Sequence, residues 1–322
     1  MDGQKTPFVR ELGSSDRKVR DKALESLTKF VQSRTDLTLV DLLKLWKGLF
    51  YCFYHSDRPL TQQALARALS YSLVPSLPHA TLHRFLRAFW ITIGRDYHSL
   101  DRIRLDKYLM LIRFYVGVAF EVLVKNKSST KSADGKKRKR EDAAKQGRGK
   151  KQKKQAEAEA ETAEDEEEKD SAEDLEAKFE AKFPDLAAYI SIIEEGPLCP
   201  LNYDEDQAPD EGDPNYVPMP HGPDGLRYHL IDIWVDELEK VLEFEEVAGE
   251  DGEETPKRKI KGDVPIELIL RPLEKLRAES AYKPVRTRAA EALEDERLIE
   301  WGVRTRKADD EDDSEEEWGG FE

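Results

Sequence analysis

Residues 38–54, TLVDLLKLWKGLFYCFY, decide the fold class of this 322-residue chain. Apolar side chains occupy most of the circumference of the helix that this segment would form, and its charged residues are confined to Asp41, Lys44 and Lys47. A helix that is apolar on most of its sides is buried in the interior of a larger assembly. The segment therefore predicts the central helix of an all-helical core.

Amphipathic helices are predicted on both sides of this central helix. Residues 16–33 place apolar side chains on one helical face, and residues 60–73, 81–93 and 100–124 follow as further helical segments. Short breaks that contain Asp, Ser or Pro separate these segments, and Asp57 is predicted to cap the helix 60–73. The region lacks the period-2 alternation of strands.

The succession of helices predicts an all-α fold, specifically a HEAT-like helical repeat (an α-solenoid). Helices of this length joined by short breaks are typical of such arrays. Residues 16–24, DRKVRDKAL, resemble the start of the second helix of a HEAT repeat, and residues 282–293 have the same character. No strict period connects the two segments, so a compact helical bundle stays the alternative.

Composition divides the chain into helical regions and charged segments. Residues 226–247 are predicted as one helix and residues 248–262 as a charged break, and Pro272 is predicted to kink or restart the helix 264–278. The predicted regions are an N-terminal helical-repeat region (1–124), a low-complexity linker that is basic and then acidic (125–174), short helices (175–195), an extended connector (196–224), C-terminal helices that pack on the N-terminal region (225–307) and an acidic disordered tail (308–322).

The formal net charge of −15 conceals a strong asymmetry along the chain. Residues 1–124 carry a net charge of +7, residues 125–155 of +11, residues 156–180 of −11 and residues 181–322 of −22. Such asymmetry favours nucleic acid or a highly charged assembly as the partner. The charged fraction of 37% also argues against one compact globule, because part of the chain cannot bury enough apolar surface to offset ordering entropy.

Several classes of protein are disfavoured by what the sequence lacks. It has no apolar run of membrane-spanning length, and its first residues lack the pattern of a secretory signal. It has no nucleotide-binding loop or nucleophile elbow, and Cys52 and Cys199 stand too far apart for a zinc knuckle. His79 and His83 have the spacing of a metal chelate without a third ligand, so a surface or capping role is favoured. We expect a non-enzymatic protein of a reducing compartment, with no cofactor, metal, small-molecule substrate or membrane partner.

Two basic clusters separated by a short gap lie in the charged segment after residue 124. Such a pair is typical of a bipartite nuclear localisation signal. A solvated linker or a loose RNA-binding arm is the alternative. The residues of the two clusters are Lys136, Lys137, Arg138, Lys139, Arg140, Lys150, Lys151, Lys153 and Lys154.

Candidate RNA contacts lie within residues 95–108. Basic side chains there would contact phosphates, while Tyr97 and Tyr108 would stack on bases. Asp101 and Asp106 offer partners inside the protein, for example in a pair between Arg102 and Asp106, so a salt-bridge network between helices is the equally weighted alternative. The basic candidates are Arg95, Arg102, Arg104 and Lys107.

Large aromatic residues on the predicted helices are candidates for partner binding. Most of them are expected in the core, and any that reach the surface would mark a protein–protein groove. The candidates are Trp46, Tyr51, Tyr54 and Trp90.

Several stretches together resemble the ribosomal-RNA-processing protein 1 family of eukaryotic nucleolar proteins. The resemblance covers roughly residues 1–125 and 224–303. The stretches that carry it are residues 45–53 (LWKGLFYCF), 56–63 (SDRPLTQQ), Phe89 and Trp90 with residues 95–113, residues 225–234 (GLRYHLIDIW) and residues 301–303 (WGV).

This resemblance implies a non-catalytic, HEAT-like scaffold of the nucleus and nucleolus. Members of the family join precursors of the large (60S) ribosomal subunit and are needed for processing of pre-rRNA. The implied partners are other assembly factors, among them WD-repeat and Brix-domain proteins, and precursor rRNA. A HEAT-type nuclear transport or interaction adaptor and a metal-dependent ribonuclease are the alternatives.

Overall fold

A computed structural model describes residues 11–12, 14, 16–125, 180–201, 217–247 and 257–305. The predicted nuclear localisation clusters, most of the predicted linker and the predicted acidic tail lie outside these residues. The N-terminal elements are α2 (Arg17–Ser33), α3 (Leu39–Tyr54), α4 (Pro59–Arg67), the π-helical turn η1 (Ala68–Ser72), the 3₁₀ turn η2 (Val74–Ser76), α5 (His79–Asp96), the 3₁₀ turn η3 (Tyr97–Ser99) and α6 (Arg102–Lys125). The C-terminal elements are α9 (Pro184–Glu195), α10 (Asp224–Glu239), β1 (Phe244–Val247), β2 (Lys257–Ile260), α11 (Ile266–Glu279), α12 (Lys283–Leu293) and α13 (Glu296–Glu300).

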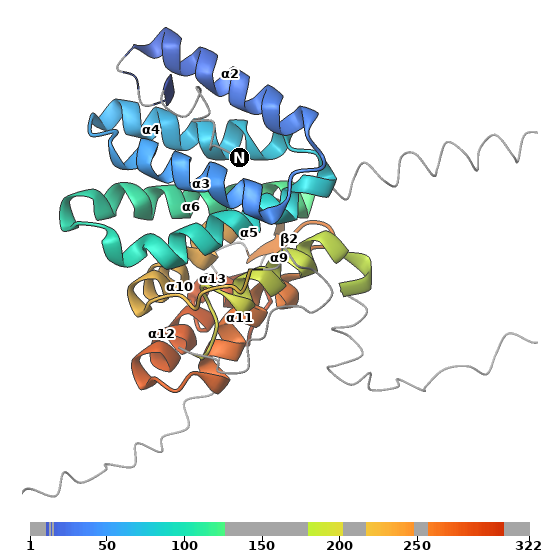
Figure 1. Cartoon of the computed structure of the whole chain (residues 1–322). Helices are drawn as coiled ribbons and strands as arrows, with labels where there is room; N and C mark the ends of the chain where they lie inside the picture. Colours follow the sequence, from blue (N-terminus) through green and yellow to red (C-terminus); the bar gives the residue numbers. More distant parts are fainter. Residues whose placement is uncertain are drawn as a thin grey trace, which may run out of the picture.

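The helices form a stack of layers. Figure 1 shows α2 at one end, followed by α3 and α4, then α5 and α6, with α11 and α12 at the opposite end. Helix α3 packs on α5 and α4 packs on α6, while α9 and α10 pack on the other side against α5 and α6 respectively. Helices α11 and α12 complete the stack through contacts with α9 and α10. The two halves of the chain therefore share one continuous core.

Helix α3 lies in the core of the N-terminal layers, as its composition predicts. Its first turn is fixed by a capping box, in which the Thr38 and Asp41 side chains each accept from the other residue's backbone N–H. The Trp46 ring lies between helices, 4.9 Å from the Phe89 ring centroid and 5.3 Å from that of Tyr115. Phe89 and Tyr115 stack at 3.8 Å, so α3, α5 and α6 meet in one aromatic cluster.

A second aromatic anchor ties the C-terminal helices to α6. Trp234 of α10 is fully buried, and its ring lies 5.1 Å from that of Phe120 in α6. Its indole N–H donates to the backbone oxygen of Ile269 in α11 at 2.9 Å, which satisfies the one polar group of this side chain. Trp234 thus connects three helices through a single residue.

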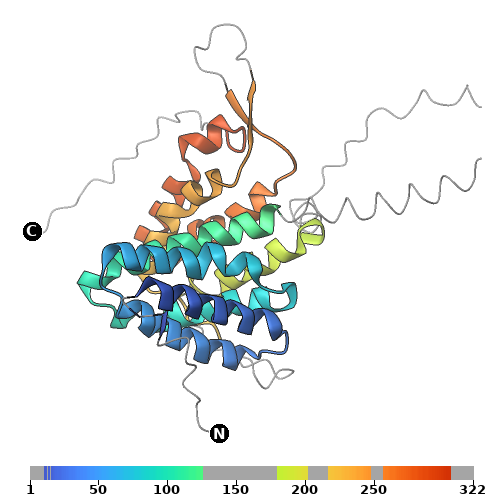
Figure 2. The same ribbon diagram turned by 90° about the horizontal axis from the view of Figure 1, so that it is seen from above.

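The main departure from the predicted elements is a two-stranded antiparallel ribbon. The predicted helix 226–247 ends at Glu239, and β1 then pairs with β2, which the sequence placed in a charged break. Phe244 stands opposite Ile260, and Glu245 stands opposite Lys259. Apolar and opposite-charge cross-strand pairs stabilise such a ribbon, and Figure 2 shows that it projects from the helical body.

The all-α fold class is confirmed, because among the described residues strands occur only in this short ribbon. Helix α11 continues through Pro272, so of the two predicted outcomes the restart does not occur and the kink stays a prediction. The HEAT-like repeat stays a prediction. Of the helices in the described part of the chain, none combines the length and the apolar composition needed to span a bilayer.

Candidate interaction surface at the ends of helices α3 to α6

The predicted RNA-binding segment lies where the C-terminal ends of α3 and α5 meet the N-terminal ends of α4 and α6. Helix α3 ends at Tyr54, and residues 55–58 lead into α4, which begins at Pro59. A proline fits this first helical position because its missing N–H would have no partner there. Helix α6 is fixed against α3 by Tyr108, whose hydroxyl donates to the backbone oxygen of Phe50 at 2.8 Å.

A network of charged and polar side chains joins these helix ends. The Tyr54 hydroxyl donates to the Asp101 carboxylate at 2.9 Å, and the Arg104 guanidinium donates to the same oxygen at 2.5 Å. Arg104 also donates to the Tyr54 backbone oxygen and lies 3.3 Å from the Asp57 carboxylate. Its guanidinium carbon is 4.4 Å from the centroid of the Tyr54 ring, at cation–π distance.

Lys107 completes the network from the interior. Only 5% of this residue is exposed, and its ammonium group donates to the backbone oxygens of Tyr54 (2.7 Å) and Ser56 (3.0 Å) and to the Asp57 carboxylate (3.3 Å). An ammonium group has three N–H donors, so all three are used. Burial lowers the pKa of Lys107, and the bond with Asp57 opposes that shift.

Asp57 has a different role from the predicted one. The N-cap residue of α4 is Arg58, and no side chain caps this helix. The Asp57 carboxylate instead accepts from Arg104 and Lys107, which lower its pKa below the ordinary value. The prediction of a cap is therefore wrong. The carboxylate binds Arg104 and Lys107 instead, which follow Asp57 by 47 and 50 residues in the sequence.

The four predicted RNA contacts divide into two pairs. Arg104 and Lys107 belong to the network, which is the salt-bridge alternative weighed from the sequence. Arg95 and Arg102 are exposed. The Arg95 guanidinium lies 3.8 Å from the Asp96 carboxylate. The predicted pair between Arg102 and Asp106 does not form in the part of the chain that the structure describes. Contact with phosphate stays a prediction for Arg95 and Arg102.

The four aromatic candidates also divide. Trp46 and Trp90 are 2% and 1% exposed, so the structure places both in the core, where a partner cannot reach them. Tyr54 is half-buried, and its hydroxyl is bound to Asp101. Tyr51 is the most accessible of the four, with 48% exposed.

Sequence reasoning missed the exposed aliphatic side chains at the same helix ends. Leu60, in the first turn of α4, is 82% exposed, and Ile103, in the first turn of α6, is 90% exposed. The sequence could have indicated both, because Leu60 follows a proline and Ile103 stands between two arginines, each at the start of a predicted helix. We name six of the exposed residues of these helix ends the helix-end surface; they are Tyr51, Arg58, Leu60, Arg95, Arg102 and Ile103.

The two histidines with chelate-like spacing bind a neighbouring helix. The Nε2 atoms of His79 and His83 lie 2.8 Å from the Asp185 carboxylate and from the Asp185 backbone oxygen respectively, at the start of α9. Within the described ranges, no group of three or more His, Cys, Asp or Glu side chains has an arrangement that could hold a metal ion. The histidines therefore join α5 to α9.

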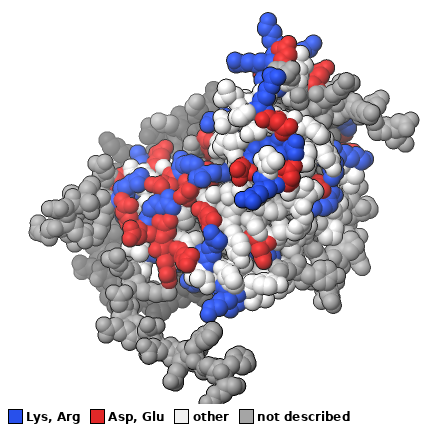
Figure 3. Space-filling model, turned by 90° about the vertical axis from the view of Figure 1, so that its left-hand side faces the viewer, with Lys and Arg blue, Asp and Glu red and all other residues white. Residues whose placement is uncertain are grey.

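Basic and acidic side chains are interspersed on the face shown in Figure 3, with uncharged surface between the charged groups. Ion pairs link helices, as in the pairs of Arg87 with Glu195 at 2.6 Å and of Arg113 with Asp236 at 2.8 Å.

Comparison with known proteins decides the family. Residues 3–136 and 215–319 match the family described as nucleolar protein, Nop52. The chain belongs to the Nop52 family. Both the family predicted from the sequence and the nucleolar localisation are thereby confirmed.

Relatives of this Nop52-family chain are ribosomal RNA processing proteins. The human ribosomal RNA processing protein 1 homolog B is 39% identical over 124 residues, which are 37% of this chain and 16% of that protein. The human homolog A is 38% identical over 121 residues, 36% of this chain and 26% of that protein. The Drosophila melanogaster homolog is 31% identical over 129 residues, 38% of this chain and 19% of that protein. The matched part thus spans about a quarter or less of the length of these relatives.

Proposed function

We propose that this chain is a non-catalytic assembly factor of the pre-60S ribosomal particle, required for pre-rRNA processing. It acts as a helical scaffold, with a HEAT-like arrangement of helices, that binds other assembly factors and precursor rRNA. The observation that carries the proposal is the Nop52 family match, which includes helices of both halves of the stack. The names of the relatives support a role in rRNA processing.

The helix-end surface is the proposed site of contact with precursor rRNA. Arg95 and Arg102 would bind phosphate oxygens, because their guanidinium groups are exposed and Arg102 has no ion-pair partner among the described residues. Arg58 is also exposed and lies in the loop between α3 and α4. Arg104 and Lys107 position the loop 55–58 from which Arg58 projects, rather than binding RNA themselves.

Protein partners are proposed to bind the aliphatic and aromatic part of the same surface. Tyr51, Leu60 and Ile103 expose apolar area that water solvates poorly and that a partner would cover. By family resemblance, the partners are WD-repeat and Brix-domain assembly factors. The basic clusters at residues 136–140 and 150–154 are proposed to direct nuclear import, and the acidic segments to attract basic factors.

Crosslinking of the full-length chain in nuclear extract tests this proposal. We expect precursor rRNA and large-subunit assembly factors to be recovered with the unmodified protein. The double substitution Arg95→Glu with Arg102→Glu is expected to reduce RNA crosslinks strongly, because it places negative charge beside phosphate.

The matched control is Arg277→Glu with Lys283→Glu. These residues are exposed cations of α11 and α12, so the control changes the net charge equally but far from the helix-end surface. Equal loss of RNA crosslinks in both variants would contradict the assignment of the contact. Recovery of transport factors or messenger RNA alone would favour the nuclear adaptor, and metal-dependent cleavage of precursor RNA would favour a ribonuclease.

A further inference from the structure

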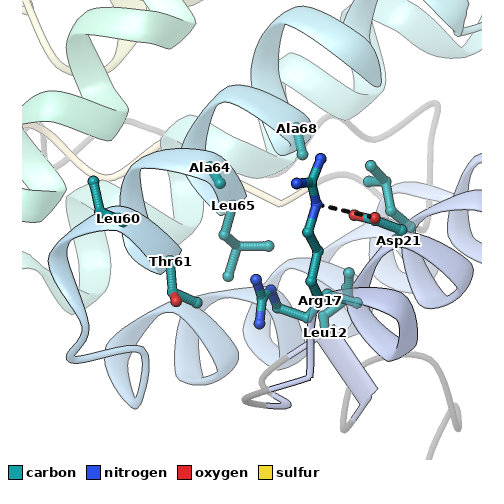
Figure 4. Close-up of a pocket in the computed structure, with 10 residues that line it drawn as sticks. Leu12, Arg17, Asp21, Leu60, Thr61, Ala64, Leu65 and Ala68 are labelled. Carbon is teal, nitrogen blue, oxygen red and sulfur yellow. Dashed lines mark ion pairs between the residues drawn. The ribbon is translucent and has the colours of Figure 1, made fainter.

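A groove lies between α2 and the helical segment formed by α4 and η1 (Figure 4). Its volume is about 410 Å³, within the range of roughly 300–1,000 Å³ that is usual for ligand pockets. Leu65 and Ala68 line it from one side and Arg17 and Asp21 from the other, and Leu60 stands at the end of the same wall as Leu65. The groove is therefore apolar on the α4 side and charged on the α2 side.

The apolar side has both a floor and an uncovered residue. Leu12 and Leu65 are buried and form part of the floor, together with half-buried Leu24. Leu60, in contrast, is 82% exposed. A ligand that enters the groove would cover Leu60 and extend the apolar contact that Leu65 begins.

The charged side is basic. The charged residues that line the groove are Arg17 and Arg20 against Asp21, all on α2, and α4 and η1 hold no acidic residue. The Arg17 side chain is 85% exposed, and its distance of 3.5 Å from Asp21 makes a loose pair. The rim therefore attracts negative charge.

A peptide fits these features better than RNA does. None of the described residues that line the groove is aromatic, so it offers no platform on which a base would stack. A phosphate backbone would use the arginines but would leave the apolar floor and Leu60 uncovered. An acidic peptide segment with an apolar side chain as its anchor satisfies both walls.

We propose that the occupant is the acidic segment 309–322 of the same chain, DDEDDSEEEWGGFE. This segment holds no basic residue and carries two aromatic side chains, Trp318 and Phe321, directly after its acidic run. The acidic residues match the basic rim, and the aromatic side chains match the apolar floor.

The chain is long enough for this contact. The described residues end at Thr305, beside Arg304, which pairs with Glu267 and Glu274 of α11. Trp318 stands thirteen positions after Thr305, and this stretch spans up to about 45 Å when extended. Helix α4 packs on α6, α6 contacts α9, and α9 packs on α11, and these three steps correspond to about 30 Å at the usual spacing of 8–10 Å between packed helices.

Photocrosslinking of the full-length chain tests the proposal. A photoreactive benzoylphenylalanine replaces Trp318, and mass spectrometry maps the crosslinks after irradiation of the monomeric fraction. We expect crosslinks within one chain to α2 and α4, with lower yield at high salt. Leu60→Asp is expected to reduce their yield on the order of tenfold, since it removes an apolar anchor and repels the acidic segment.

Ile103→Asp is the matched control, because Ile103 is also an exposed aliphatic residue in the first turn of a helix but does not line the groove. It is expected to leave the crosslinks unchanged. Both changes fall on exposed side chains, and circular dichroism checks that the helices are retained. Crosslinks to other parts of the chain, crosslinks only between two copies, or equal loss in both variants would overturn the proposal. None of these readouts depends on the proposed role in rRNA processing.

Discussion

Replacing Lys107 by methionine separates a structural role of this residue from a role in RNA binding. Methionine keeps much of the apolar stem of the side chain but removes the ammonium group. The backbone oxygen of Ser56 loses its donor at 3.0 Å, and the Asp57 carboxylate loses one of its two cations. The backbone oxygen of Tyr54 keeps a donor, because the Arg104 guanidinium still binds it at 3.1 Å. The variant thus leaves one buried carbonyl group without its partner.

The expected loss of stability follows from these contacts. A hydrogen bond to a charged group contributes about 1.5–3 kcal/mol, and leaving a buried acceptor unsatisfied costs about 1–3 kcal/mol. Removing a buried charge offsets part of the loss, so we expect the free energy of unfolding to fall by about 2–4 kcal/mol. With a urea m-value of about 2 kcal/mol/M, the unfolding midpoint falls by about 1–2 M.

Urea titration of the full-length chain, followed by far-ultraviolet circular dichroism, measures this midpoint. Arg102→Met is the control, because Arg102 is an exposed neighbour without an ion pair in the described part of the chain. Its effect is expected to stay within about 0.5 kcal/mol. Equal midpoints for the two variants would refute the structural role of Lys107. A stable Lys107→Met protein that lost its RNA crosslinks would restore Lys107 as an RNA contact.

Three other changes test the network, the core and the ribbon. Asp57→Asn is expected to weaken the dependence of stability on acid. Because the pKa of Asp57 is lowered in the folded state, the unfolded chain binds more protons than the folded one. The stability that Asp57 contributes is therefore present above the unfolded pKa of about 3.9 and is lost as the pH falls through the lower folded pKa. Urea midpoints at about pH 5 and pH 3 should differ less in the variant, and an unchanged difference would argue against the network. Trp46→Ala is expected to cost about 3–5 kcal/mol, whereas exposed Tyr51→Ala costs little; similar thermal midpoints would contradict the placement of Trp46 in the core. Phe244→Ala removes a ring that lies 4.1 Å from the Arg258 guanidinium and 5.3 Å from the Trp301 ring, so hydrogen exchange in β1 and β2 should speed up while α10 is unaffected.

The helices were predictable from the sequence because their signals are local. The nearly continuous apolar residues of α3 predict a buried helix, and Pro59 marks the boundary between α3 and α4. The ribbon was not predictable in this way, since the pairing of Phe244 with Ile260 joins residues on either side of a charged segment. The apolar spacing of α10 also continues past Glu239 to Val241 and Leu242, which extends the helical pattern beyond the helix.

The candidate site was predictable only in part. The sequence located the segment 95–108, but it could not separate Arg102, which is exposed, from Lys107, which is buried, because the groups that bind Lys107 belong to α3 and the loop after it. A helix that is apolar on nearly every side gives no indication of which aromatic faces solvent. The structure was therefore needed to place Trp46 inside and Tyr51 outside.

Sedimentation of the full-length chain in nuclear extract tests the central claim most directly. The extract is separated on a sucrose gradient, and each fraction is probed for this protein and for precursors of the large-subunit and small-subunit rRNAs. If the chain is a scaffold of the pre-60S particle, it sediments with the large-subunit precursors and moves to the top of the gradient after ribonuclease treatment. Sedimentation at the top without ribonuclease, or with small-subunit precursors alone, would contradict the account.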